Sequence, residues 1–231
     1  MRNWTQLGVA PIPGSERTLG LYQSKDDFHI IISGGLELMN TRKHASEDAL
    51  GRLPCEQLAD TASARVLIGG LGMGFTLAAV LNAVGAQAEV TVAELIPEVV
   101  EWNRGVLGER SGHPLDDPRT RVYVGDVAEL LRAADIAYDV IVLDVDNGPE
   151  GLSKQGNDWL YSERGITAAR KALSPTGIVG YWSAAADNAF RQRLQRCGFR
   201  VEEVLVYAHG NKGARHTLWL AHNQSKQRTS K

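Results

Sequence analysis

Cysteine is scarce in this sequence, since Cys55 and Cys197 are its only two. Two thiols are too few for a disulfide scaffold and fit a reducing compartment. No stretch approaches the roughly 18 uninterrupted apolar residues of a membrane span, and residues 1–20 have no apolar run like that of a signal peptide. We therefore expect a cytoplasmic protein with no membrane partner.

A strong charge of either sign is also missing. The chain has 25 basic and 27 acidic residues, so its formal net charge is −2. This balance provides no overall attraction to nucleic acid, and we expect no nucleic-acid partner. The six histidines show no metal-ligand spacing, so no metal site is predicted.

What is present is ordinary globular composition, with 231 residues of which 43% are hydrophobic. We expect residues 1–60 to form an N-terminal β-hairpin appendage and a linking helix. Residues 61–222 are predicted to form one larger domain, and the polar, basic residues 223–231 a disordered tail.

The appendage is indicated by short β-like runs. Thr18–Ser24 and Phe28–Ser33 are separated by a Lys-Asp-Asp turn, and Leu36–Asn40 follows two glycines. Residues 45–59 are predicted to be helical, with Ser46 as the N-cap.

From Arg65 onward, apolar strand patterns alternate with helical patterns. The predicted strands are Val66–Ile68, Glu89–Ala93, Arg121–Val124, Val140–Leu143 and Gly177–Trp182, and the helices are Phe75–Val84, Pro97–Leu107, Val127–Ala133, Glu163–Leu173 and Asn188–Cys197. Two final strands, Arg200–Tyr207 and Ala214–Ala221, form a closing hairpin. This order predicts a doubly wound α/β fold, and the hairpin favours a Rossmann-like class I methyltransferase fold with a mostly parallel seven-stranded sheet.

Candidate binding residues follow the predicted strands, at the edge where open parallel sheets bind ligands. They are the loop glycines Gly70, Gly72 and Gly74, then Glu94 for ribose hydroxyls, Asp126 with Val127 for adenine, and Asp144 facing the crevice. The dinucleotide fingerprint would need a glycine where Phe75 stands, so the spacing favours an adenosyl-sulfonium compound over NAD.

Each of these features also has a purely structural interpretation. The glycine loop could serve only a tight turn, Glu94 could lie beside a helix N-cap, and Asp126 could cap the helix that begins at Val127. Asp144 could cap the loop after its strand. Three acids that each follow an apolar strand make coincidence a poor explanation of the set.

These motifs carry a resemblance. Residues 33–221 resemble spermidine synthase-like proteins, a branch of the class I S-adenosylmethionine-dependent transferases. The matching segments are Ser33-Gly34, Arg42–Glu47, Ile68–Gly74, Val92–Glu94, Val124–Asp126, Val142–Asp144, Leu160–Ser162 and Val179–Ser183. The resemblance implies a nucleotide loop, a ribose acid at Glu94, an adenine acid at Asp126, a catalytic aspartate at Asp144 and a homodimer.

The sequence departs from true spermidine synthases where those enzymes recognise their amines. Their loop has an acid that holds the aminopropyl amine of decarboxylated S-adenosylmethionine, and Gly72 stands at that position here. Their second acceptor-binding acid aligns with Asn147, next to Asp146, and their tyrosine aligns with Ala45. The donor is thus S-adenosylmethionine or its decarboxylated form, with methyl transfer favoured.

The implied chemistry is displacement at a carbon bonded to sulfonium by a small-molecule amine. A carboxylate can hold the amine in line or take its proton, and we assign this role to Asp144 with Asp146. The long segment 144–163 is predicted to form the acceptor pocket through Asn147, Asp158, Trp159 and Tyr161. Trp159 and Tyr161 could equally be hydrophobic anchors.

Three alternatives remain open at this point. A polyamine aminopropyltransferase is the first, and a non-catalytic adenosyl-nucleotide-binding relative is the second. Nucleic-acid amine methylation is disfavoured, because no Pro-Pro-aromatic run follows Asp144. We interpret His216, in the closing strand, as a structural residue.

Overall fold

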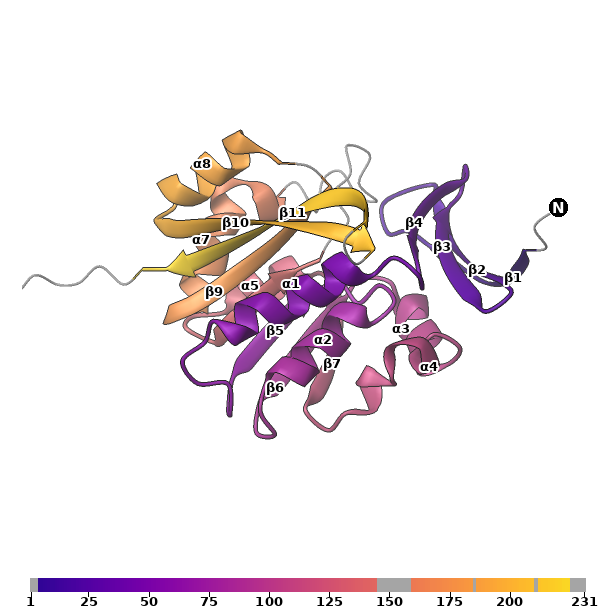
Figure 1. Ribbon diagram of the computed structural model, residues 1–231, viewed down its shortest axis with the longest axis horizontal. Coiled ribbons are helices and arrows are strands. Elements are labelled where there is room, and N and C mark those ends of the chain that lie inside the picture. The colour runs from indigo at the N-terminus through magenta and orange to yellow at the C-terminus, as the bar shows by residue number, and fades with distance from the viewer. Residues whose placement is uncertain (1–3, 145–158, 185, 210–211, 225–231) are drawn as a thin grey trace, which may run out of the picture.

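The computed structural model describes residues 4–144, 159–184, 186–209 and 212–224 (Figure 1). The predicted site residues Asp146, Asn147 and Asp158 lie outside these described residues. The predicted tail begins within the last described segment, and residues 225–231 lie outside it.

The N-terminal part is a four-stranded antiparallel sheet in the order β1-β2-β3-β4. Its strands are β1 (Thr5–Pro11), β2 (Thr18–Ser24), β3 (Asp27–Ile32) and β4 (Leu36–Asn40). The β3–β4 turn uses Gly34 and Gly35 at positive φ, which a β-carbon would strain. Sequence reasoning missed β1, because Gly8 and Pro11 weaken its strand pattern.

The larger domain contains a seven-stranded sheet in the order β10-β11-β9-β8-β5-β6-β7. Its strands are β5 (Arg65–Gly69), β6 (Glu89–Glu94), β7 (Thr120–Val124), β8 (Tyr138–Leu143), β9 (Leu173–Ser183), β10 (Phe199–His209) and β11 (Lys212–Asn223). The five strands from β9 to β7 pair in parallel, and β11 pairs antiparallel with both β9 and β10. This is the predicted parallel sheet with a closing hairpin.

Helices cover both faces of this sheet (Figure 1). They are α1 (Ala45–Glu56), α2 (Phe75–Ala83), α3 (Pro97–Arg104), α4 (Gly108–Ser111), the 3-10 helix η1 (Pro114–Asp116), α5 (Val127–Ala133), α7 (Glu163–Ala172) and α8 (Asn188–Arg196). Alternate residues of each strand enter different cores, because strand side chains alternate in direction. Ile68 and Val142 join the core under α1, α2 and α3, whereas Leu67 and Ile141 join the core under α5, α7 and α8.

The start of α1 differs from the expectation. The helix begins at Ala45 with His44 at the N-cap, and no side chain caps it. Ser46 is not the cap, because it lies inside the first turn and its hydroxyl donates to Glu47 Oε2 at 2.6 Å. The Ser46 side chain is buried there instead of facing the helix end.

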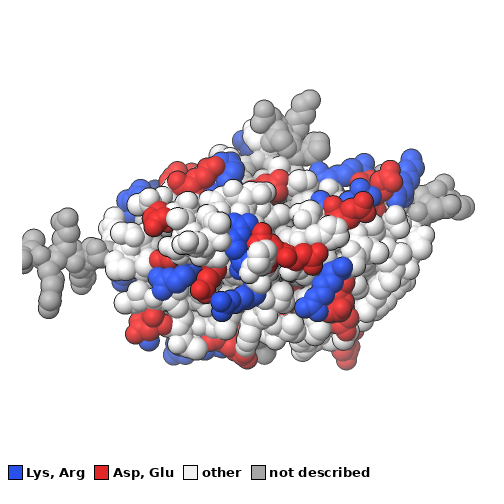
Figure 2. Space-filling model, turned by 90° about the horizontal axis from the view of Figure 1, so that it is seen from below, with Lys and Arg blue, Asp and Glu red and all other residues white. Residues whose placement is uncertain are grey.

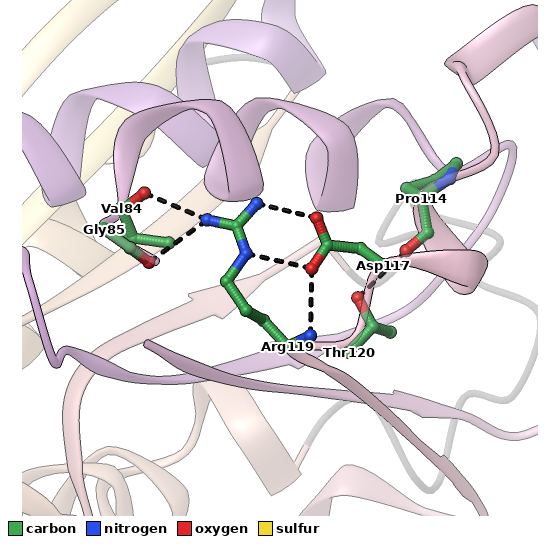
Figure 3. A network of polar contacts seen from close by, with 6 residues as sticks. All are labelled: Val84, Gly85, Pro114, Asp117, Arg119 and Thr120. Carbon is green, nitrogen blue, oxygen red and sulfur yellow. Dashed lines mark hydrogen bonds and ion pairs between the residues drawn. The ribbon is translucent and has the colours of Figure 1, made fainter. Parts of the chain in front are cut away.

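A polar network fixes the start of β7 to the end of α2 (Figure 3). The Arg119 guanidinium donates to both carboxylate oxygens of Asp117, at 2.9 and 2.7 Å. It also donates to the carbonyl oxygens of Val84 and Gly85, at 3.0 and 3.2 Å. The edge strand is thereby joined to the turn that follows α2.

The molecular surface carries both signs of charge. On the face shown in Figure 2, Lys and Arg side chains lie interspersed with Asp and Glu side chains. Opposite charges that are neighbours largely cancel at a distance in salt solution. This mixture agrees with the near-neutral net charge of the whole chain.

Candidate functional site

The carboxyl ends of β5, β6 and β8 lie together at one edge of the sheet. The Asp144 amide donates to the Gly69 carbonyl at 2.9 Å, and the Gly70 amide donates to the Ala93 carbonyl at 2.8 Å. The residues that follow these strands are therefore neighbours in space, as the sequence predicts for the glycine loop, Glu94 and Asp144.

The glycine loop needs its glycines. Gly70, Gly72 and Gly74 have φ values of +94°, +53° and +83°, in the region that residues with a β-carbon rarely adopt. At Gly74 a β-carbon would also lie 2.9 Å from Asn103 Oδ1 and from Ser111 Oγ. Gly74 is the N-cap of α2, so the loop delivers the amide groups of that helix's first turn to the sheet edge.

The Glu94 side chain is hydrogen-bonded to the backbone of the glycine loop. Its side chain is buried, and its two carboxylate oxygens accept hydrogen bonds from the amides of Leu71 and Ile96, both at 2.9 Å. Burial raises the pKa of Glu94, and the hydrogen bonds from backbone amides oppose that rise. The bond to Leu71 connects the end of β6 directly to the glycine loop.

Asp126 caps α5. Its Oδ1 accepts a hydrogen bond of 2.8 Å from the Ala128 amide, as the structural interpretation of this residue expects. Val127 is buried in the core beneath. The role of Asp126 and Val127 toward adenine stays a prediction.

Asp144 faces a small cavity between the N-terminal sheet and the larger domain. Its Oδ2 accepts a hydrogen bond of 2.6 Å from the Thr76 hydroxyl. The cavity is lined by residues from β4, α1, the glycine loop, α2 and the end of β8: Met39, Asn40, Glu47, Leu71, Gly72, Met73, Phe75, Thr76 and Asp144. Asp144 and Gly72 therefore share one cavity.

Sequence reasoning assigned no role to Glu47 or Thr76, which line the same cavity. Glu47 is half-buried, and this burial raises the pKa of its carboxyl group. The signal was present, because the segment Arg42–Glu47 carries part of the family resemblance and ends on this residue. Local sequence does not show, however, that α1 brings Glu47 to the same cavity as Asp144.

Trp159 and Tyr161 lie elsewhere. The Arg132 guanidinium stacks over the Trp159 ring at 4.2 Å, and the Tyr161 ring packs against Tyr181 and Phe190 at 5.7 and 5.2 Å between centroids. Neither residue is among those that line the cavity. These contacts favour the hydrophobic-anchor interpretation, and an acceptor-binding role stays a prediction.

Two further observations concern other kinds of site. In the part of the chain that the structure describes, no cluster of three or more His, Cys, Asp or Glu side chains is arranged to hold a metal ion. No helix in the described ranges is long and apolar enough to cross a membrane.

Comparison with known proteins identifies the family. Residues 44–189, more than half of the chain, match the model of the spermine/spermidine synthase domain. The chain belongs to the spermine/spermidine synthase family. This confirms the resemblance drawn from the glycine loop and the acids that follow the strands.

Relatives of this family member include enzymes with two different reactions in their names. The polyamine aminopropyltransferase of Mycobacterium tuberculosis is 27% identical over 157 residues, which cover 67% of this chain and 28% of the relative. Polyamine aminopropyltransferase 1 of Streptomyces coelicolor is 28% identical over 209 residues, 83% of this chain and 36% of the relative. Putrescine N-methyltransferase 1 of Nicotiana tabacum is 32% identical over 116 residues, 50% of this chain and 29% of the relative.

Solved structures confirm the predicted fold class. A spermidine synthase in complex with the transition state analogue AdoDATO has a TM-score of 0.73 at 19% identity, over 94% of this chain and 72% of that one. The spermidine synthase of Thermotoga maritima has a TM-score of 0.74 at 18% identity, with the same coverage. The chain spans only 28–36% of the length of the three curated relatives named above.

Proposed function

We propose that this protein transfers an alkyl group from an S-adenosylmethionine-type donor to a small amine. The observation that carries the proposal is the cavity in which the Asp144 carboxylate lies beside the glycine loop. The curated relatives support an amine acceptor, since the names of both groups refer to polyamines or putrescine.

Residues at the sheet edge suit an adenosyl donor. The Glu94 carboxylate accepts hydrogen bonds from the Leu71 and Ile96 amides, and we assign to it a further bond from a ribose hydroxyl of the donor, since each carboxylate oxygen has two lone pairs. In the same way Asp126 can accept from the adenine amine while Oδ1 caps α5. Loop amides at the start of α2 can hold the polar end of the donor.

Asp144 suits the acceptor amine. The donor is activated by its positive sulfur, so the protein chiefly orients a neutral nucleophile and handles a proton. The hydrogen bond from Thr76 holds the Asp144 carboxylate in one orientation at the cavity. From there it can hold the amine in line with the carbon to be transferred.

Methyl transfer is the reaction we favour. No side chain projects from Gly72, and a β-carbon there would lie 3.1 Å from Met39 Sδ. An acid at this position would repel the carboxylate of S-adenosylmethionine and attract the ammonium of the decarboxylated donor. At about 4 Å and an effective dielectric near 20, such a pair is worth up to about 4 kcal/mol.

Aminopropyl transfer is the second candidate, and Glu47 favours it. This carboxylate lines the cavity next to Gly72 and could supply the negative charge that the loop lacks. Most of the relatives described above are also named as aminopropyltransferases.

Calorimetry and a transfer assay test both candidates. The protein is titrated with S-adenosylmethionine, its decarboxylated form and methylthioadenosine. It is then incubated with each donor and each of a set of small amines, putrescine among them, and the products are examined by mass spectrometry. We expect binding of the carboxylated donor and addition of a methyl group. Addition of an aminopropyl group would instead establish the second candidate. Failure of all three compounds to bind would overturn both, and binding without transfer to any amine would indicate a non-catalytic relative.

A further inference from the structure

A buried asparagine on α3 holds the glycine loop from the side of the core. Asn103 is 1% exposed, and its Nδ2 donates to the Gly72 carbonyl at 2.8 Å and to the Val99 carbonyl at 2.9 Å. These two carbonyl oxygens fix the orientation of the side-chain amide, because only its nitrogen can donate to them. Asn103 and Gly72 are 31 positions apart in the sequence, so the contact fixes the loop relative to α3.

The oxygen of the same side-chain amide is unpaired. In the part of the chain that the structure describes, Asn103 Oδ1 is buried and has no hydrogen-bond partner. It lies beside Gly74, where a β-carbon would be 2.9 Å from it. A buried acceptor without a partner costs free energy, and an apolar side chain would avoid that cost. Packing alone is thus a poor explanation of Asn103, and its bond to Gly72 is the contact that reaches the candidate site.

The bond to Gly72 decides which way the next peptide group faces. The peptide bond between Gly72 and Met73 is trans, so the Gly72 carbonyl and the Met73 N–H point in opposite directions. The carbonyl points to Asn103 in the core, and the N–H therefore points away from the core. Met73 is also one of the residues that line the cavity shared by Gly72 and Asp144.

The Met73 amide differs from its neighbours in the loop. The Leu71 amide donates to Glu94 at 2.9 Å, and the Gly74 amide donates to the Leu71 carbonyl at 2.8 Å. Within the described residues, no hydrogen bond of the Met73 amide is found. Buried backbone N–H groups are rarely left without a partner in proteins. An N–H at this position therefore suits an acceptor atom that a ligand supplies.

We propose that Asn103 is a positioning residue of the donor site, which turns the Met73 N–H toward the carboxylate of S-adenosylmethionine. This inference rests on the proposed function, in which the glycine loop holds the polar end of the donor. N–H groups bind a charged acceptor more strongly than a neutral one, and the carboxylate is the charged acceptor at that end. The decarboxylated donor and methylthioadenosine lack this group, so Asn103 favours the carboxylated donor over both.

This role is separate from that of position 72. Gly72 carries no side chain that could repel the carboxylate of the donor, which removes an obstacle to its binding. The Met73 N–H adds an attraction for the same carboxylate. Proteins commonly discriminate between ligands by combining an attraction for one with a repulsion against the other. The two residues can therefore be tested independently.

The first test is calorimetric titration of the full chain with S-adenosylmethionine, its decarboxylated form and methylthioadenosine. Asn103→Leu keeps the approximate size of the side chain and removes its N–H donors. We expect the affinity for S-adenosylmethionine to fall at least about tenfold, as for a lost hydrogen bond to a charged group, while the other two affinities stay within about threefold of wild type.

Val99→Ala is the matched control for a general loss of packing. Val99 is buried one turn earlier on the same helix, and Asn103 bonds to its main-chain carbonyl, which the variant retains. Its affinities for the three compounds should keep the wild-type proportions. If Asn103→Leu weakens all three compounds alike, Asn103 has only a structural role and the inference is overturned. Three unchanged affinities in Asn103→Leu would overturn it as well.

A second test uses the wild type and does not depend on the folding of Asn103→Leu. The chain has three methionines, Met1, Met39 and Met73, so labelling methionine with nitrogen-15 leaves few NMR signals, and Met39→Leu assigns that of Met73. A hydrogen bond to a carboxylate moves an amide proton downfield. S-adenosylmethionine should therefore move the Met73 signal further downfield than the decarboxylated donor does. Equal displacements by the two donors would overturn the proposed contact.

The proposed function and the role of Asn103 fail under different results. A wild type that binds none of the three compounds overturns both together. A wild type that transfers an alkyl group to an amine, while Asn103→Leu binds the three compounds as the wild type does, overturns the role of Asn103 alone. That role is also overturned by a wild type that transfers only aminopropyl groups from the decarboxylated donor.

Discussion

The hydroxyl of Thr76 donates a hydrogen bond of 2.6 Å to Oδ2 of Asp144. This bond joins the first turn of α2 to the residue that follows β8, across 68 positions of sequence. Thr76 is 2% exposed, so water does not replace the bond when it is lost. The bond thus fixes the position of α2, which follows the glycine loop, relative to Asp144, the candidate catalytic acid that follows β8.

Thr76→Val removes the hydroxyl and keeps the shape of the side chain. A hydrogen bond to a charged group is worth about 1.5–3 kcal/mol, so kcat/KM should fall roughly 10- to 100-fold. Thr76→Ser retains the donor and should stay within about threefold of wild type. Steady-state kinetics with the preferred donor measures both, and a fully active valine variant would contradict an orienting role for this bond.

Gly74→Ala tests the loop geometry through stability. Alanine at φ +83° costs about 1–2 kcal/mol, and its β-carbon would press on Asn103 and Ser111 at 2.9 Å. We expect a loss of about 2–4 kcal/mol in the free energy of unfolding. Gly112→Ala is the matched control, since φ is +78° there with nothing within 4 Å, and it should cost about 1–2 kcal/mol. Equal losses for Gly74→Ala and Gly112→Ala in urea denaturation would show that Asn103 and Ser111 shift to make room for the β-carbon.

Arg119→Ala tests the network in Figure 3. The variant removes the bonds to Asp117, Val84 and Gly85, and we expect a loss of about 1.5–3 kcal/mol in the free energy of unfolding. Arg121→Ala, two residues further along the chain in β7, is the control. Its pair with Glu89 spans 3.6 Å between side chains that are 70% and 60% exposed, so its loss should stay within about 0.5 kcal/mol. Similar denaturation midpoints for the two variants would contradict a structural role for Arg119.

The contribution of the same network to stability should depend on pH through Asp117. The hydrogen bond and charge of Arg119 hold the pKa of Asp117 below its ordinary value of 3.8. A lowered carboxyl pKa adds stability that is fully present above about pH 4 and is lost as the pH falls through the folded-state pKa. Wild type should therefore exceed Asp117→Asn in stability at pH 6, and the difference should shrink below pH 4. A difference that stays constant from pH 6 to pH 3 would contradict this assignment.

How far the sequence predicts this molecule depends on whether a feature is local. Strand β8 is predictable because its β-branched run is continuous, and Glu94 and Asp144 because each follows such a strand. The cavity that Asp144 and Glu47 line cannot be predicted from local sequence, since it forms only when α1 packs on α2. Gly51 of α1 lies against the backbone of Thr76 there. The same limit applies to His216, whose partner Ser46 is remote in sequence.

An acid introduced at position 72 is predicted to change the donor preference, provided that Met39 leaves room for it. Asp tolerates the left-handed region better than most residues, so φ +53° at Gly72 is accessible to it. Its β-carbon would meet Met39 Sδ and Cε at 3.1 and 3.2 Å, and Met39→Ala removes that obstruction.

We expect the Gly72→Asp/Met39→Ala variant to bind decarboxylated S-adenosylmethionine at least tenfold better, relative to the carboxylated form, than wild type does. The physical reason is that the added carboxylate attracts the ammonium of one donor and repels the carboxylate of the other. Gly72→Asn/Met39→Ala has the same shape without the charge, and its ratio of the two affinities should stay within about threefold of wild type. Calorimetric titration with both donors measures these ratios. An unchanged ratio in the aspartate variant would mean that residue 72 does not face the amino-acid end of the donor, because a full charge at that position could not otherwise leave the two affinities in the same proportion.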